Sequence, residues 1–158
     1  MTPQPAPGAP EHPALAQLPP ELRPGAARAL ARGERLDRLI PGALLDSPIS
    51  RAGAAYATVV GAAWGFVWST GPVERHGDLW VFRGMPRLTF VRGGTCVGRC
   101  YLTGDGAVGE AVLRHEAVHV RQWRRYGMLF PLLNLIAGRD ARRNRFEIEA
   151  GLRDGNYL

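Results

Sequence analysis

The spacing of apolar positions predicts three amphipathic helices. Between residues 21 and 39, apolar side chains recur every three or four positions among Arg and Glu, which is the period of one helix face. The same period runs from about residue 108 to 126, and Gly127 follows as a candidate cap. A charged segment at 140–153 predicts the last helix, with Asp140 as its candidate N-cap.

Between these helices the chain changes to the pattern of short strands. Residues 79–83, 88–92 and 96–103 are rich in β-prone residues and are separated by Gly and Pro. We therefore expect a small antiparallel sheet, with His76 in an exposed polar loop before it. Helices packed around such a sheet make an α+β fold.

Composition divides the chain into a short extension and one domain. Seven prolines fall within the first 20 residues, so residues 1–20 are expected to be disordered. Residues 21–158 are expected to form a single domain, because a chain of 158 residues is too short for two comfortable cores. The first 25 residues lack a basic stretch followed by an apolar run, which predicts no signal peptide and a cytoplasmic location.

Residues 52–73 carry no charged side chain and are numerous enough to cross a bilayer. Ala, Gly, Ser and Thr dominate the segment, however, and its strongly apolar aliphatic or phenyl groups are few. They are Val59, Val60, Phe66 and Val67. A helix buried in the domain is the favoured interpretation, and membrane contact through residues 52–73 stays open as the alternative.

The net charge of +6 changes this picture little. All 20 basic residues are Arg, in a chain rich in Ala, Gly and Pro, which is typical of a GC-rich coding bias. Nucleic acid is therefore a disfavoured partner. Arg clusters within residues 121–125 and 139–145 keep a surface for phosphates as an alternative.

The two cysteines, Cys96 and Cys100, are too few for a disulfide-rich scaffold. Their spacing within one strand would place both side chains on the same face, where a disulfide would require a bend in the backbone. Two reduced thiols are the favoured interpretation.

The predicted helix at 108–126 contains the pattern His-Glu-x-x-His, formed by His115, Glu116 and His119. Residues four apart lie one turn above each other on the same helix face, so both imidazoles can bind one metal ion. A glutamate between them is placed to accept a proton from a metal-activated water. We therefore predict a Zn²⁺ site with His115 and His119 as ligands and Glu116 as the general base.

Catalytic zinc takes three protein ligands, so a third must come from elsewhere. The helix predicted at 140–153 offers Glu147 and Glu149, and Glu147 is the favoured ligand. The run Glu147-Ile148-Glu149-Ala150 resembles the start of Glu-x-x-Ala-Asp in gluzincins, a class of zinc metallopeptidases, and Gln122 and Tyr126-Gly127 extend the resemblance. Gly151 replaces the usual Asp, which normally supports a ligand histidine.

This resemblance covers about 50 residues, from Leu102 to the end of the chain, and implies a zincin-like domain that hydrolyses peptide bonds. It also implies that the segment 96–103 is an edge strand that pairs with a peptide or protein substrate. The alternative is a non-catalytic domain, either stabilised by zinc or peripheral to a membrane. The sequence leaves the oligomeric state open.

Overall fold

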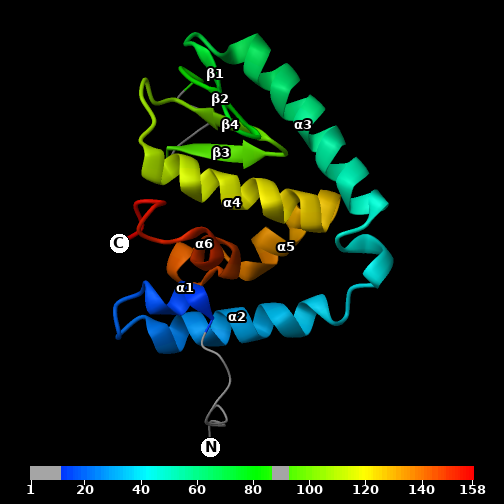
Figure 1. The fold of residues 1–158 in the computed structure, drawn as a ribbon, viewed down its shortest axis with the longest axis vertical. Coiled ribbons are helices and arrows are strands. Elements are labelled where there is room, and N and C mark those ends of the chain that lie inside the picture. Colours follow the sequence, from blue (N-terminus) through cyan, green and yellow to red (C-terminus); the bar gives the residue numbers. More distant parts are fainter. Residues whose placement is uncertain (1–11, 87–92) are drawn as a thin grey trace, which may run out of the picture.

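A computed structural model describes residues 12–86 and 93–158, and shows a mixed α+β fold (Figure 1). The strand expected at 88–92 lies outside the described residues. The elements are α1 (Pro13–Ala16), α2 (Arg23–Asp37), η1 (Gly42–Leu44), α3 (Pro48–Trp68), β1 (Val73–His76), β2 (Leu79–Phe82), β3 (Gly94–Val97), β4 (Cys100–Thr103), α4 (Glu110–Tyr126), η2 (Gly127–Leu129), α5 (Phe130–Ala137), η3 (Ala141–Arg143) and α6 (Arg145–Ala150).

The sheet has the order β1-β2-β4-β3, and it is mixed rather than antiparallel, because β2 and β4 run parallel. The single strand expected at 96–103 is in fact the hairpin β3–β4, which turns at Gly98 with φ +62°. A matching hairpin turns at Gly77 with φ +59° and adds β1, which the sequence pattern did not predict. Positive φ at both turns suits glycine, which has no Cβ to clash.

Helices α3 and α4 cover opposite faces of this sheet (Figure 1). Leu79, Val81 and Tyr101 pack against Val120 of α4. On the opposite face, Phe82 and its neighbours lie against α3. The sheet is therefore the middle layer, and α4, the helix that carries the predicted site, is held along its length by buried apolar contacts.

Helix α3 packs in a way that the sequence pattern did not predict. Its buried positions are small residues, among them Gly61 and Gly65, where a Cβ would come within 2.8 Å of Val97 O and 2.4 Å of the Phe82 ring. Small side chains thus let the helix lie close to the sheet. Its large apolar residues instead face solvent, with Val59 67% exposed. The prediction of a buried helix is wrong for this outer face.

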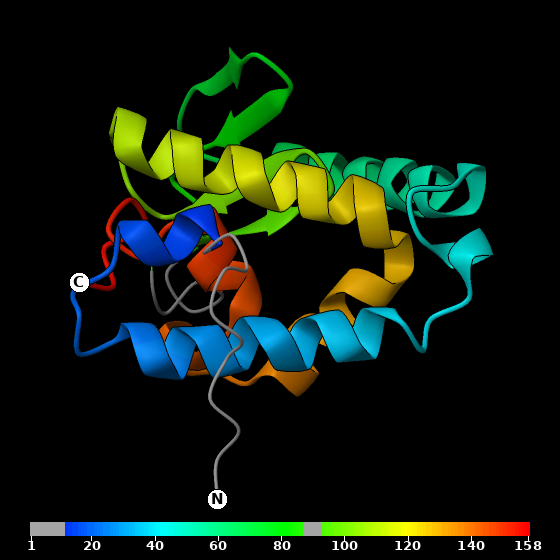
Figure 2. The ribbon, with the colours of Figure 1, turned by 60° about the horizontal axis from the view of Figure 1, so that its bottom comes forward.

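A further helical layer lies on the far side of the predicted site (Figure 2). In it α1 and α2 pack against α6, with Leu15 and Leu18 buried beside Ile148. Residues 12–20 are therefore part of the fold, and the expectation of a disordered extension over residues 1–20 is wrong for them. Residues 1–11 lie outside the described residues.

The last helix differs from its expected bounds of 140–153. Asp140 caps only the short turn η3, by accepting a hydrogen bond from the Arg142 backbone N–H. Asn144 is the N-cap of α6, because its side chain accepts from the Phe146 backbone N–H at 2.9 Å. Helix α6 has six residues, too few to be stable without tertiary contacts.

Helix α6 is fixed to α2 and α4 by a buried ion pair. Arg145 is 5% exposed and donates to Asp37 at 2.7 Å, and the Tyr126 hydroxyl donates to the same carboxylate at 2.7 Å. The Arg145 guanidinium also lies over the Phe146 ring. This contact sets the position of the residues that follow Arg145 on α6.

We expect Asp37→Ala to lower the free energy of unfolding by about 3 kcal/mol, because it leaves the Arg145 guanidinium buried without a counter-charge. For a chain of this size the midpoint of thermal unfolding should fall by roughly 6–12 °C. Asp78→Ala removes the exposed pair with Arg99 and is the control, with an expected loss below about 1 kcal/mol. Equal losses in the two variants would show that the buried pair does not anchor α6.

Candidate metal centre

The predicted metal ligands lie on the inner face of α4. His115, Glu116 and His119 are 2%, 7% and 7% exposed. Residues 115 and 119 are one helical turn apart, and their rings are 4.7 Å apart between centroids. Helix α4 spans Glu110–Tyr126 and ends at Gly127 with φ +54°, so the helix and its cap confirm the pattern in the sequence.

Helix α6 brings Glu147 against these two histidines. His115 Nε2 lies 3.1 Å from Glu147 Oε2 and 3.1 Å from His119 Nε2, and His119 Nε2 lies 3.6 Å from Glu147 Oε2. Together the three residues form a group that could hold a metal ion. Of the two rival carboxylates, Glu147 is the one that the structure places in this group.

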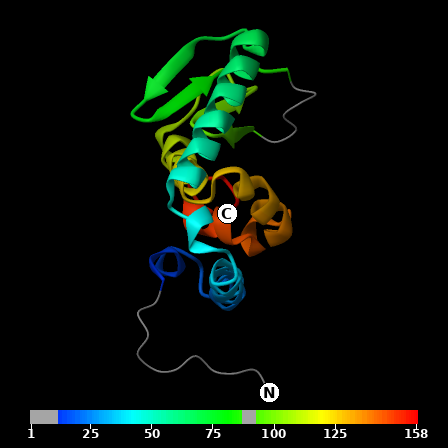
Figure 3. The same cartoon turned by 90° about the vertical axis from the view of Figure 1, so that its right-hand side faces the viewer.

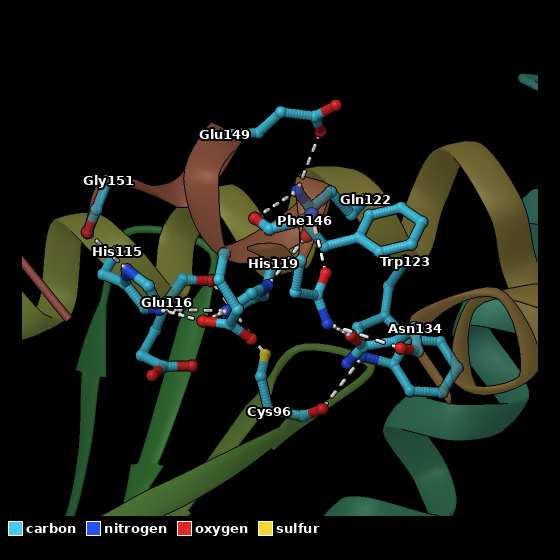
Figure 4. Close-up of polar contacts among 12 residues, drawn as sticks. Cys96, His115, Glu116, His119, Gln122, Trp123, Asn134, Phe146, Glu149 and Gly151 are labelled. Carbon is cyan, nitrogen blue, oxygen red and sulfur yellow. Dashed lines mark hydrogen bonds and ion pairs between the residues drawn. The ribbon is translucent and has the colours of Figure 1, made fainter. Parts of the chain in front are cut away.

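A hydrogen bond from the His115 ring to the backbone of Gly151 fixes which ring nitrogen carries the proton. Its Nδ1 lies 3.1 Å from the carbonyl oxygen of Gly151 (Figure 4). A carbonyl only accepts, so Nδ1 is the donor and the neutral ring turns the lone pair of Nε2 towards Glu147. The backbone carbonyl of Gly151 thus orients the His115 ring.

Gln122 in the same way fixes which ring nitrogen of His119 carries the proton. The Gln122 amide nitrogen donates to the Phe146 carbonyl and to Glu149 Oε2, both at 3.0 Å. Its oxygen therefore faces His119 Nδ1 at 2.7 Å and accepts the proton there (Figure 4). Glu149 lies behind this amide, where it orients Gln122, and burial raises the pKa of Glu149.

When both rings are neutral, three acceptor atoms therefore face one another with no donor among them. Burial acts to raise the pKa of Glu147, but contacts with His115 and His119 hold this pKa well below its usual range. Burial acts to lower the pKa of His119, and the neighbouring Glu147 carboxylate raises it above the usual value. Both shifts indicate a site that favours positive charge between the side chains, supplied by a proton or by a metal ion.

The spacing of the three atoms also suits a small tetrahedral ion. Ligands about 2.0–2.1 Å from a tetrahedral zinc ion are about 3.3 Å from one another. The observed separations of 3.1, 3.1 and 3.6 Å lie close to that value. Two imidazoles and one carboxylate are also a donor set that zinc binds in catalytic sites.

Glu116 lies beside this group without joining it. Its carboxylate is buried, and its Oε2 atom has no hydrogen-bond partner among the described residues. Burial raises the pKa of Glu116 above its usual value, against the lowering effect of the two histidines. An unpartnered buried carboxylate is costly to the fold, so its position needs an explanation in the chemistry of the site.

Tyr157 is a site residue that the sequence reasoning missed. Its ring centroid lies 5.9 Å from that of His115, in the C-terminal segment after α6. Burial, followed by the charge of Glu147, raises the pKa of Tyr157 to about 12, so the hydroxyl keeps its proton. No motif connects Tyr157 to α4, and a single aromatic residue outside any motif carries no sequence signal of its own.

Two hollows open on either side of the site. One has a volume of about 730 Å³ and is lined by β3, by Phe130 and Leu135 of α5, and by Glu147 and Tyr157. The other has a volume of about 440 Å³ and is lined by Gly94, Glu116 and Tyr157 among others. Strand β3 is at the edge of the sheet and borders both hollows.

The remaining candidates lie outside the metal-binding group. Cys96 and Cys100 are both free and lie on opposite faces of the β3–β4 hairpin, so the expectation that they share a face is wrong. Cys96 approaches the Glu116 carbonyl on α4, whereas Cys100 approaches Thr58 on α3. His76 is in β1, not in a loop, and pairs with Glu74.

Comparisons with protein-family models, with curated proteins and with solved structures gave no match to this chain. The resemblance to gluzincins therefore has no support from these comparisons. The functional argument depends on the geometry of the site itself.

Proposed function

We propose that this protein is a zinc-dependent peptidase in which His115, His119 and Glu147 bind the metal and Glu116 is the general base. One observation carries the proposal. Two Nε2 atoms, whose protons are held on the far side of each ring, face a carboxylate at 3.1–3.6 Å. Such a convergence of acceptors is unfavourable unless a cation or a proton lies between them.

A bound zinc ion would supply Lewis-acid chemistry and lower the pKa of a bound water to about 7. Glu116 would accept the proton of that water as its oxygen attacks the peptide carbonyl. The resulting carboxylic acid would then donate this proton to the leaving amine nitrogen.

The edge position of β3 supports an extended peptide as the substrate. The backbone groups along one side of β3 (Gly94–Val97) have no strand partner among the described residues, and this strand borders both hollows at the site. A peptide that added to β3 would place its main chain across Glu116 and Glu147. Phe130 and Leu135 would contact its side chains, which favours apolar residues beside the cleaved bond.

Tyr157 is suited to donate a hydrogen bond to the oxyanion that forms at the attacked carbonyl, because its hydroxyl stays protonated beside the site. Tyr157→Phe removes only this hydroxyl. We expect kcat for peptide hydrolysis to fall by roughly 10²-fold while KM changes by less than about 3-fold. A change confined to KM would indicate that Tyr157 contacts the substrate before the reaction and does not stabilise the oxyanion.

The second candidate is a non-catalytic domain in which zinc only holds α6 against α4. The observation that favours it is the length of α6, since a helix of six residues needs external support. The ion pair between Arg145 and Asp37 already provides such support without a metal ion. We therefore favour the catalytic proposal.

Removal of the metal tests the two candidates against each other. We expect about one zinc ion per chain after purification without chelators, and we expect peptidase activity that a chelator abolishes and added zinc restores. The circular dichroism spectrum should change little on chelation, because the core contacts of α4 and the ion pair of α6 remain. Unfolding on chelation, with no hydrolysis of any peptide in a mixed library, would establish the structural alternative instead.

A further inference from the structure

The outward side of α3 is a surface that the peptidase proposal does not use. Its large apolar side chains are exposed, with values of 67% for Val59 and 70% for Val67. We call this surface the α3 outer face; it consists of Tyr56, Val59, Val60, Trp64, Phe66, Val67 and Trp68. No charged residue occurs between Arg51 and Glu74, so the face is apolar from end to end. An apolar patch of this extent indicates a binding surface.

Of these side chains, Phe66 packs edge-on against the buried Phe82 ring, with 5.1 Å between the centroids. The opposite side of α3 meets the sheet through small residues such as Gly61 and Gly65, which leaves the large residues outside. Viewed from that side, α3 lies along the outside of the molecule, and none of the other described elements covers it (Figure 3). The exposure of the α3 outer face is therefore a consequence of how the helix packs.

A groove with cations at its rim runs beside this face. It has a volume of about 450 Å³ and lies between α3, α4 and the β3–β4 turn, with Ala54 and Trp123 in its apolar lining. Arg51, Arg99 and Arg124 also line it. Arg99 pairs with Asp78, whereas Arg51 and Arg124 form no ion pair within residues 12–86 and 93–158. Two guanidinium groups beside the face are thus available for an anionic partner.

We propose that the α3 outer face binds the surface of an anionic lipid bilayer, with Arg51 and Arg124 in contact with lipid phosphates. Trp, Tyr and Phe beside cationic side chains are the composition of helices that lie in the membrane interface. No helix in the described part of the chain is long and apolar enough to cross a membrane. This inference is independent of the metal site.

Charge complementarity favours the bilayer over a second copy of the chain. In a dimer formed through α3, the facing helix would offer no carboxylate between Asp46 and Glu74 to receive Arg51 or Arg124. The two cationic grooves would add to each other's charge. An anionic bilayer supplies both an apolar phase for the helix and phosphates for the guanidinium groups.

The test is binding of the full chain to vesicles of phosphatidylcholine, alone or with about 30% phosphatidylglycerol. We expect binding to the anionic vesicles, a blue shift of tryptophan fluorescence from Trp64 and Trp68, and weaker binding at about 0.5 M salt. Val59→Glu with Val67→Glu should lower binding at least about 10-fold, because both carboxylates would enter the interface. Arg51→Glu with Arg124→Glu should also weaken binding to the anionic vesicles.

The matched control is Arg28→Glu with Arg35→Glu, which makes the same charge change on exposed positions of α2 and should leave most of the binding intact. Thermal unfolding of each variant shows whether it still folds. The proposal is overturned if folded wild-type protein binds no vesicles, or if the α2 and α3 charge variants weaken binding equally. A dimer that Val59→Glu with Val67→Glu dissociates, without vesicle binding, would assign the face to a second copy.

Discussion

Glu116→Gln is expected to leave about one zinc ion bound per chain and to lower kcat for peptide hydrolysis by roughly 10²–10⁴-fold. The amide has nearly the shape of the carboxylate, so the packing of α4 is preserved. It cannot accept the proton of the attacking water. The measurement pairs elemental analysis with steady-state kinetics on a peptide that the wild type cleaves.

Glu110→Gln is the matched control for this variant. Glu110 lies on the same helix but in its exposed first turn, away from the histidines. Its replacement should leave kcat within about 2-fold of the wild type, since a lone exposed charge contributes little. Turnover by Glu116→Gln at the wild-type rate would show that another group takes the proton, and would overturn the assigned role of Glu116.

Glu147→Ala should lower the zinc content from about one ion per chain to less than about 0.1 when the protein is dialysed against low zinc. Two imidazoles alone bind zinc weakly, because catalytic sites require three protein ligands. Activity should fall with the metal content. His115→Ala should give the same loss, because the two variants remove ligands of one ion.

The variant Glu149→Ala tests whether Glu147 or Glu149 is the third metal ligand. Glu149 contacts Gln122, which orients His119, and it does not join the group of three. We expect this variant to keep its zinc with an affinity about 10-fold lower, as for other residues that support a metal ligand. Loss of zinc from Glu149→Ala with retention in Glu147→Ala would reverse the assignment of the third ligand.

The outcome for α3 shows why hydrophobicity alone did not predict which side of the helix is buried. The sequence analysis noted that the segment has few strongly apolar groups besides Val59, Val60, Phe66 and Val67, and therefore favoured a helix inside the domain over a membrane contact. The structure buries the small residues, because the close approach to Val97 and Phe82 leaves no room for a side chain at positions 61 and 65. Steric fit with the sheet therefore decided which side of α3 faces solvent.

The topology of the sheet could not be read from the strands themselves. The residues of β2 and β4 do not indicate whether these two strands pair in parallel or antiparallel. Their parallel pairing follows from the position of the β3–β4 hairpin, whose outer strand β3 lies at the edge beside the site. That position depends on packing against α3 and α4, which no local pattern records.

The sequence by itself determined α4 and the shared face of His115 and His119, because the period of the α-helix is a local property of the chain. It also indicated Glu147 through a resemblance rather than through spacing. Only the tertiary structure decided that Gly151 supports His115 through its carbonyl, and that Tyr157 reaches the site. These contacts join residues that are 36 and 42 positions apart, and their formation depends on how the packed layers bring α6 and the C-terminal segment against α4.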